Sequence, residues 1–349
     1  MKTSELREAF NAALAGGSLD AAGAERAYAE ILDGGAAAPE ALVAGFLVAL
    51  KLKHESAGEL TGAARAMRSR ARTLELGDNL IDVVGTGGDG AGTFNISTGA
   101  AIVAAAAGVA VAKHGNRAIT GLVGAADVLE YLGVNIDPGP AVLARCIREA
   151  GICFILAPAY HPVMARLGAL RRALATRTIF NLLGPLTNPA RPRRMLVGVG
   201  DRMLLRPMAE AIAALGATHA LVVSGHDGLD EISLSAPTHV AEVRAEHGTC
   251  EYDIAPEDFG IARASVGSLG AASAATSAGM LRAALSGKHD PAGDVLALNA
   301  GAAIHAGGGA ESIAAGVKLA REVIGSRRPL ATIDKLVRAS GGEPGKPVR

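Results

Sequence analysis

Tryptophan is absent from this sequence of 349 residues, and aromatic residues make up only 3% of it. Half of the residues are hydrophobic, so a sizeable core has to be built from Ala, Leu, Val and Ile, with many Ala and Gly residues allowing close packing. The shortage of aromatic rings also leaves little material for stacking on nucleic-acid bases. We therefore expect a large globular protein with an aliphatic core.

Cysteine is scarce as well. The three cysteines, Cys146, Cys153 and Cys250, form no Cys-x-x-Cys pair and no spacing typical of metal ligands. This usage indicates a reducing compartment, so we expect free thiols that are buried as small core residues.

The sequence also lacks net charge and long apolar runs. Lys plus Arg and Asp plus Glu each number 34, and the resulting zero charge removes any overall attraction to nucleic acid or anionic membranes. The N-terminus has no apolar signal core, and the uncharged run Thr98–Val111 is too short to span a membrane. The sequence therefore predicts a soluble, cytoplasmic protein without nucleic-acid or membrane partners.

Hydrophobic periodicity divides the chain near residue 79. Before that point it predicts four helices, at residues 4–15, 19–32, 39–53 and from 57 onward. After it, short apolar runs predict strands at residues 79–84, 109–112, 152–157, 196–199 and 219–224. Helices are predicted between these strands at residues 98–107, 125–132, 141–149 and 203–215.

This alternation indicates an α/β fold, with a small N-terminal helical domain and a larger domain whose mostly parallel central sheet is flanked by helices. Residues 231–254 alternate Thr, Val and charged residues, which favours antiparallel strands or an irregular excursion. Helices return from Ala278, and residues 341–349 are predicted to be a flexible tail.

The most informative motif is Asp82–Gly90, in which a strand runs into a glycine-rich loop. Asn95-Ile96-Ser97-Thr98-Gly99 then opens an Ala-rich helix. Glycines let the backbone approach a ligand closely, and a helix N-terminus offers free N–H donors and partial positive charge. The order of strand, glycines, hydroxyls and helix predicts a phosphate site, although a tight turn capped by Ser97 is the simpler alternative.

Two other nucleotide motifs fit less well. Gly85, Gly87 and Gly90 match the dinucleotide pattern G-x-G-x-x-G in spacing, but the helix opens only near Ser97. No acidic residue lies near the expected ribose position about 20 residues further on. The Walker pattern fails because no Gly-Lys-Ser/Thr follows the glycines.

Two further polar clusters follow predicted strands, whose carboxyl ends should share one crevice with the glycine loop. Lys113-His114-Gly115-Asn116-Arg117 offers a point charge for phosphate, although such a run alone is typical of a solvated loop. His226–Glu231 ends in adjacent carboxylates, which suit Mg²⁺ beside phosphates, whereas an isolated Asp-Glu pair is usually only an acidic loop.

A last candidate segment begins at Tyr160-His161-Pro162. The helix that it opens carries Arg171-Arg172, and the run 177–189 follows. Arginines on an apolar helix are most often surface residues, and the alternative is a guanidinium that holds a substrate carboxylate through two hydrogen bonds.

Taken together, these segments resemble the anthranilate phosphoribosyltransferases over nearly the whole chain. The most specific likeness lies in Gly85–Asp89, Asn95–Thr98, Lys113–Arg117, Phe180–Pro189 and Asp227–Ser233. The resemblance implies transfer of the phosphoribosyl group from 5-phosphoribosyl 1-diphosphate to the amine of anthranilate, a step of tryptophan biosynthesis. It also implies a homodimer, with a helical domain at 1–75 joined by helices near 165–190, an α/β domain at 76–340 and a tail at 341–349.

The resemblance also implies a set of site residues. Catalytic roles are implied for Asp89, Lys113, Asp230 and Glu231. The diphosphate substrate would be bound by Gly85, Thr86, Gly87, Gly88, Asp89, Asn95, Ser97, Thr98, Lys113, Thr120 and Ala125. Anthranilate would be bound by Gly85, His114, Asn116, Tyr160, His161 and Arg171, with Arg171 on its carboxylate. About two Mg²⁺ ions per subunit would be held by Ser97, Asp230 and Glu231.

Two segments depart from the family pattern. Where relatives have a hydroxyl-rich run with a basic residue, this chain has Leu122 and Val123, and residues 270–277 contain only Gly, Ala, Ser and Thr. These departures leave open another aromatic acceptor. A pyrimidine-nucleoside phosphorylase needs no Mg²⁺, so the pair Asp230-Glu231 argues against it. A nucleic-acid-binding homologue would need a basic face, and the zero net charge argues against that.

Overall fold

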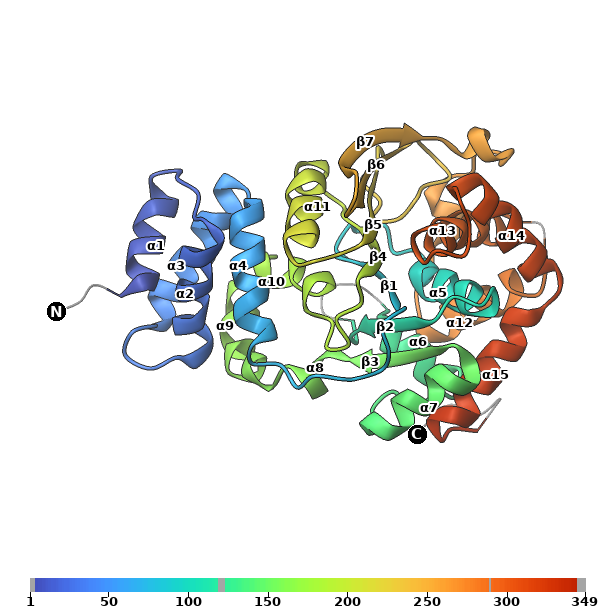
Figure 1. Ribbon diagram of the computed structural model, residues 1–349, viewed down its shortest axis with the longest axis horizontal. Coiled ribbons are helices and arrows are strands. Elements are labelled where there is room, and N and C mark those ends of the chain that lie inside the picture. Colours follow the sequence, from blue (N-terminus) through green and yellow to red (C-terminus); the bar gives the residue numbers. More distant parts are fainter. Residues whose placement is uncertain (1–3, 119–122, 289, 344–349) are drawn as a thin grey trace.

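The computed structural model describes residues 4–118, 123–288 and 290–343. A bundle of helices lies at one end of the molecule and a helix-covered sheet forms the rest (Figure 1). The first four helices are α1 (Glu5–Leu14), α2 (Ala21–Asp33), α3 (Glu40–Lys53) and α4 (Ala57–Arg68). Each of α1, α2 and α4 is capped by the residue before it, because the side chains of Ser4, Asp20 and Ser56 accept backbone N–H groups of the first turn.

Seven strands form a single sheet in the order β3-β2-β1-β4-β5-β6-β7. The five strands from β3 to β5 are parallel, whereas β6 and β7 are antiparallel to their neighbours. The strands are β1 (Ile81–Gly85), β2 (Val111–Gly115), β3 (Ile152–Leu156), β4 (Arg194–Gly198), β5 (His219–Gly225), β6 (Thr238–Arg244) and β7 (Gly248–Ile254).

Helices lie between and after the strands. Those that connect β1 to β5 are α5 (Ile96–Ala106), α6 (Ala125–Tyr131), α7 (Pro140–Ala150), α8 (Ala157–Tyr160), α9 (Gly168–Leu174), α10 (Ile179–Leu182) and α11 (Leu205–Ala214). Those that follow β7 are α12 (Ala274–Ala284), α13 (Pro291–Ala306), α14 (Ile313–Gly325) and α15 (Arg328–Ser340). Short 3₁₀ turns occur at Pro162–Leu167, Pro185–Thr187, Arg202–Leu204, Pro256–Phe259 and Val266–Leu269.

Two hydrophobic cores lie on the two faces of the sheet, because successive strand residues point to opposite sides. In β4, Leu196 packs in the core that includes α5 and α13, whereas Met195 and Val197 pack in the other core. This second core continues into the bundle without a break, from Val197 and α11 to Phe46 on α3. The bundle is therefore packed onto the sheet domain through a shared core.

The structure confirms the predicted fold class and the five predicted parallel strands, with shifts of a few residues at their ends. The second strand begins at Val111 and not at Val109, because Gly108 and Val109 close the C-terminus of α5. The segment 231–254 contains two antiparallel strands, as its alternation indicated. Helix α12 begins four residues before the predicted Ala278, where Ser273 caps it.

The cysteine prediction is partly wrong. Cys146 and Cys153 are buried free thiols, but Cys250 is exposed because it lies on the edge strand β7. No helix among the described residues has both the length and the apolar character needed to cross a membrane.

Candidate active site

The strand order reverses at β1, whose carboxyl end lies beside that of β4. The chain proceeds from β1 outward to β2 and β3, and then returns to the other side of β1 with β4. Ligands of open α/β sheets bind at such a reversal of strand order. The last residues of the two strands, Gly85 and Gly198, are direct partners there, and a side chain on either would overlap Asp230. The segment that carries Asp230 therefore closes tightly over both strand ends.

The loop after β1 is shaped by glycine. Gly87, Gly88, Gly90 and Gly92 all have positive φ angles, which side-chain-bearing residues rarely adopt. The loop leads to Asn95, which precedes α5, and Asn95 is itself fixed by Ser277, whose hydroxyl donates to Asn95 Oδ1 over 2.8 Å. Ser277 Oγ also accepts the backbone N–H of Asn95 over 3.1 Å, so two hydrogen bonds from α12 fix the residue before α5.

The acidic pair joins the loop to the helix. Asp230 Oδ2 accepts the backbone N–H of Gly87 over 2.6 Å, and Glu231 Oε1 accepts that of Ser97 over 3.1 Å. Burial, and then the charge of Asp89, raises the pKa of Asp230 to about 7. Burial and the neighbouring Asp230 raise the pKa of Glu231 well above its usual value. The carboxylates of Asp89, Asp230 and Glu231 thus lie close together, and a positive charge beside them would stabilise their ionised forms.

Lys113 supplies part of that charge from inside the sheet. It belongs to β2 and does not follow its end, and its side chain is only 2% exposed. Its Nζ donates to the carbonyl of Val83 over 2.6 Å and to Ser97 Oγ over 3.3 Å. Burial lowers the pKa of Lys113, while the charges of Asp82, Glu231 and Asp230 oppose this shift. The solvated loop that was the simpler alternative for this run is therefore wrong for Lys113.

His114 points to the opposite face of β2. It is 3% exposed, and its Nδ1 lies 3.0 Å from the carbonyl oxygen of Gly184. The ring of His161 stands 5.4 Å away, centroid to centroid, and burial lowers the pKa of both imidazoles, that of His114 to about 3. Among the described residues, His114 Nε2 and both ring nitrogens of His161 are buried without a hydrogen-bond partner. Buried polar atoms usually have partners, so these mark a place for a ligand.

The other residues predicted for the acceptor lie on separate elements. Tyr160 ends α8 and is buried, and Asn116 is half-buried just after β2. Arg171 lies on α9 with its guanidinium 6.0 Å from the ring centroid of Phe180, and burial lowers its pKa. Within the part of the chain that the structure describes, no carboxylate pairs with Arg171. A half-buried guanidinium without a carboxylate partner is suited to bind an anionic ligand.

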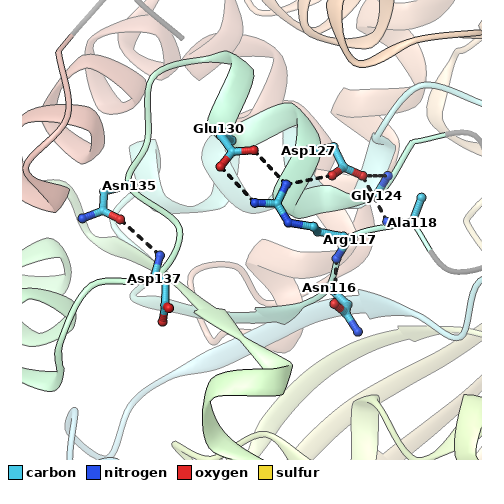
Figure 2. A network of polar contacts seen from close by, with 8 residues as sticks. All are labelled: Asn116, Arg117, Ala118, Gly124, Asp127, Glu130, Asn135 and Asp137. Carbon is cyan, nitrogen blue, oxygen red and sulfur yellow. Dashed lines mark hydrogen bonds and ion pairs between the residues drawn. The ribbon is translucent and has the colours of Figure 1, made fainter. Parts of the chain in front are cut away.

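Figure 2 shows the polar network after β2. Arg117 forms two hydrogen bonds to Glu130, of 2.7 and 2.9 Å, and one of 3.2 Å to Asp127. Asp127 Oδ2 also accepts the backbone N–H groups of Ala118 and Gly124, over 3.0 and 2.9 Å. One carboxylate therefore holds both sides of the segment that contains the predicted Thr120, which lies outside the described residues. The predicted Ala125 begins α6 directly afterwards.

The structure adds residues to which sequence reasoning gave no role. Arg177 lies against Gly88, and its Nη2 donates to the carbonyl of Thr86 over 3.0 Å, so it stiffens the glycine loop. Asp82 is fully buried and accepts from Asn188 Nδ2 over 2.8 Å and from the backbone N–H of His114 over 3.1 Å. Burial raises the pKa of Asp82 to about 6. All three residues stand inside the quoted motifs, but their partners are more than 30 residues away in the chain.

Comparison with known proteins identifies the architecture. The chain matches the glycosyl transferase family twice, in its helical bundle domain over residues 7–71 and in its a/b domain over residues 77–327. The chain thus has the two domains of this glycosyl transferase family, a helical bundle followed by an a/b domain.

Individual relatives define the family more closely. The anthranilate phosphoribosyltransferase of Rubrobacter xylanophilus is 50% identical over 336 residues, which cover 96% of this chain and 97% of the relative. The crystal structure of anthranilate phosphoribosyltransferase from Thermus thermophilus superposes with a TM-score of 0.87 at 40% identity, covering 95% of this chain and 99% of that one. The chain belongs to the anthranilate phosphoribosyltransferase family, as its motifs indicated.

A more distant structure contains ligands. The anthranilate phosphoribosyltransferase from Saccharomyces cerevisiae in complex with PRPP and Mg superposes with a TM-score of 0.85 at 27% identity, covering 96% of this chain and 98% of that one. PRPP is 5-phosphoribosyl 1-diphosphate.

Proposed function

We propose that this protein transfers the phosphoribosyl group of 5-phosphoribosyl 1-diphosphate to the amine of anthranilate and releases pyrophosphate. The observation that carries the proposal is the position of the acidic pair. Asp230 accepts the backbone N–H of Gly87 in the glycine loop, and Glu231 accepts that of Ser97 in the first turn of α5. The glycine loop and the start of α5 are the two segments expected to bind the diphosphate. The named activity of the family, and the PRPP and Mg of the yeast complex, agree with this arrangement.

The donor set fits a hard divalent cation. Carboxylate and hydroxyl oxygens are the ligands that Mg²⁺ prefers. Burial first, and then the neighbouring carboxylates, raise the pKa values of Asp230 and Glu231, and a bound cation would favour their ionised forms. Asp230, Glu231 and Ser97 would hold about two Mg²⁺ ions per subunit, and Asp89 adjoins them. Mg²⁺, when bound, supplies charge neutralisation for the diphosphate and its leaving group.

The diphosphate side would be formed by the glycine loop, Asn95, Thr98, Lys113, Thr120 and Ala125. Thr98 supports this assignment, because its hydroxyl is buried near the start of α5 without a partner among the described residues. Lys113 lies behind the loop with its ammonium directed at Ser97. From there it offsets charge that accumulates on the leaving pyrophosphate.

The acceptor side would lie across β2, on the face to which His114 points. His114 and His161 present unpartnered ring nitrogens, and Arg171 offers a guanidinium for the anthranilate carboxylate. Gly85, Asn116 and Tyr160 would complete this side. The pKa of His114 near 3 keeps that imidazole neutral at physiological pH, so it acts as a hydrogen-bonding and packing group.

The chemistry requires positioning more than proton abstraction. The aromatic amine of anthranilate is neutral at pH 7, so no strong general base is needed. The C1–O bond to pyrophosphate breaks as the amine nitrogen bonds to C1 through an oxocarbenium-like state, and the surplus amine proton is then released. Residues on the two faces of β2 would hold the two substrates in line for this displacement.

Fluorescence of anthranilate provides the test. We expect the signal to fall when 5-phosphoribosyl 1-diphosphate and Mg²⁺ are added together, and to persist when Mg²⁺ is omitted. Asp230→Asn should abolish most of the turnover with little effect on anthranilate affinity, whereas the exposed Asp78→Asn serves as a matched control. Folded protein without turnover would overturn the proposal, and other aromatic acceptors and phosphorolysis would then be screened.

We also propose the larger organisation that the family resemblance implies. The matched ranges 7–71 and 77–327 support a helical domain at 1–75 and an α/β domain at 76–340, with 341–349 as a tail. Contacts of α9 and α10 with α3 support the inclusion of helices near 165–190 in the helical domain.

A homodimer in the cytoplasm is part of the same proposal. Leu14 on α1 and Leu52 on α3 are 62% and 77% exposed, and a partner subunit would remove such side chains from water. Sedimentation analysis tests the dimer, and a monomer at micromolar concentration would contradict it.

A further inference from the structure

A second group of polar side chains converges near the active-site loop but outside the proposed machinery. His226 follows β5, His239 lies on β6 and Asp253 lies on β7. His239 and Asp253 are direct partners across the antiparallel strands, so their side chains share one face of the sheet. The backbone N–H of His226 donates to the carbonyl of Pro237 over 2.9 Å, which holds its side chain beside this pair.

The atoms of these residues that could bind a metal ion lie within 4.8 Å of one another. His226 Nε2 lies 3.2 Å from His239 Nδ1, and His239 Nδ1 lies 2.5 Å from Asp253 Oδ1. His226 Nε2 also lies 3.4 Å from Asp253 Oδ2, and the two imidazoles stack with centroids 3.8 Å apart. Each neutral imidazole has only one N–H group, and a carboxylate only accepts. A cation bound among these atoms would accept one lone pair from each of the three residues.

A group of similar composition on the opposite face of β6 already contains a cationic side chain. Glu242 lies 2.8 Å from His219 Nε2 and 3.4 Å from His305 Nε2, but it also accepts from Arg244 and Tyr252. The guanidinium of Arg244 already supplies the positive charge there. No arginine or lysine forms an ion pair with Asp253 in residues 4–118, 123–288 and 290–343, where its partners are His226 and His239.

The His226 cluster is also open to a ligand. The side chains of His226 and Asp253 are 34% and 53% exposed, while that of His239 is only 11% exposed. A pocket of about 450 Å³ adjoins the two histidines and is lined as well by Asp201 and Arg202. An ion at this place has three protein ligands and room for water as a fourth, which is the usual composition of an open tetrahedral site.

We propose that His226, His239 and Asp253 form a binding site for a borderline-soft divalent transition-metal ion, of which Zn²⁺ is the type. Two imidazoles and one carboxylate favour such ions, whereas the oxygen-only set of Asp230 and Glu231 favours Mg²⁺. The ion ties the start of the loop 226–231 to β6 and β7. It thereby braces the segment that carries the acidic pair.

Cobalt substitution tests the site directly. Tag-free protein is titrated with Co²⁺ in the presence of excess Mg²⁺, which occupies the oxygen-only site, and tetrahedral d–d absorption is recorded. We expect about one equivalent with intense visible bands, displaced by Zn²⁺. His226→Ala and Asp253→Ala should each weaken binding by at least about tenfold. The exposed His247→Ala, on the turn between β6 and β7, should bind as the wild type does.

Thermal unfolding provides a second readout that does not depend on activity. Zn²⁺ should raise the midpoint of the wild type and of His247→Ala, and should leave that of His226→Ala unchanged. His226 is partly exposed, so its removal should preserve the fold, and circular dichroism of the metal-free variant checks this. Tetrahedral bands that survive in both ligand variants, or no Co²⁺ binding by the wild type, would overturn the proposal.

Discussion

At the scale of single residues, the titration of Asp230 links metal binding to stability. Its pKa is raised to about 7 from an unfolded value of about 3.9. A raised acidic pKa contributes stability that is fully present below the unfolded pKa and is lost as the pH rises through the folded pKa. The metal-free protein should therefore lose stability between about pH 4 and pH 7 through this group.

Denaturant unfolding at several pH values measures this loss. Asp230→Asn cannot ionise but still accepts from Gly87, so the pH-dependent difference from the wild type should be on the order of 2–4 kcal/mol. Added Mg²⁺ should bind more tightly as the pH rises through about 7, because it competes with the proton. Parallel pH profiles of the two proteins would show that this carboxyl has an ordinary pKa.

Arg171 should act on acceptor binding. Arg171→Gln removes a charge-assisted hydrogen bond of about 1.5–3 kcal/mol, so KM for anthranilate should rise roughly 10–100-fold while kcat falls less. The neighbouring Arg172 is exposed, and Arg172→Gln should leave both constants near those of the wild type. Steady-state kinetics at varied anthranilate concentration measures KM and kcat of the two variants. Equal effects of the two substitutions would remove Arg171 from the site.

At the scale of elements, the ends of β1 and β4 control the acidic pair. A Cβ atom at Gly198 would overlap the backbone carbonyl of Asp230, and a carbonyl cannot rotate away as a side chain does. Gly198→Ala should lower kcat/KM by roughly 10–100-fold through displacement of the loop. Gly139→Ala is the control, because no atom lies within 4 Å of the added methyl group. Unchanged kinetics of Gly198→Ala would show that the loop tolerates the shift.

Local patterns in the sequence were sufficient for most elements and for the glycine loop that follows β1. The strand 79–84 is apolar and ends in glycine, and β1 occupies residues 81–85. The start of β2 was misplaced because Val109 has strand character, yet its N–H bonds back to α5. Arg177, Asp82 and Asn188 received no role because their function depends on partners distant in sequence. The His226 cluster comes from three separate strands or strand ends, and no spacing within the chain reveals it.

At the scale of the whole molecule, the shared core couples the bundle to the sheet. One cluster of buried side chains runs from Leu6 on α1 to Val243 on β6. Although the chain matches two family domains, we therefore expect a single cooperative unfolding transition. Scanning calorimetry should show one peak, and a separate early transition of the bundle would contradict this expectation.

Gly62→Ala tests the coupling. Its added methyl group would overlap the backbone of α2, so the whole transition should lose on the order of 1–3 kcal/mol without splitting. Gly279→Ala in α12 meets open space and should be neutral or stabilising by about 0.5–1 kcal/mol. Denaturant unfolding compares the two, and a larger loss at Gly279 would contradict the packing argument.

The two backbone hydrogen bonds that Asp127 accepts, from Ala118 and Gly124, have a consequence for engineering. Because one carboxylate binds the backbone on both sides of residues 119–122, the attachment points of that segment are set by α6 and not by its own sequence. We therefore expect that a hydroxyl-rich sequence can replace the segment between Ala118 and Gly124 without moving these two attachment points.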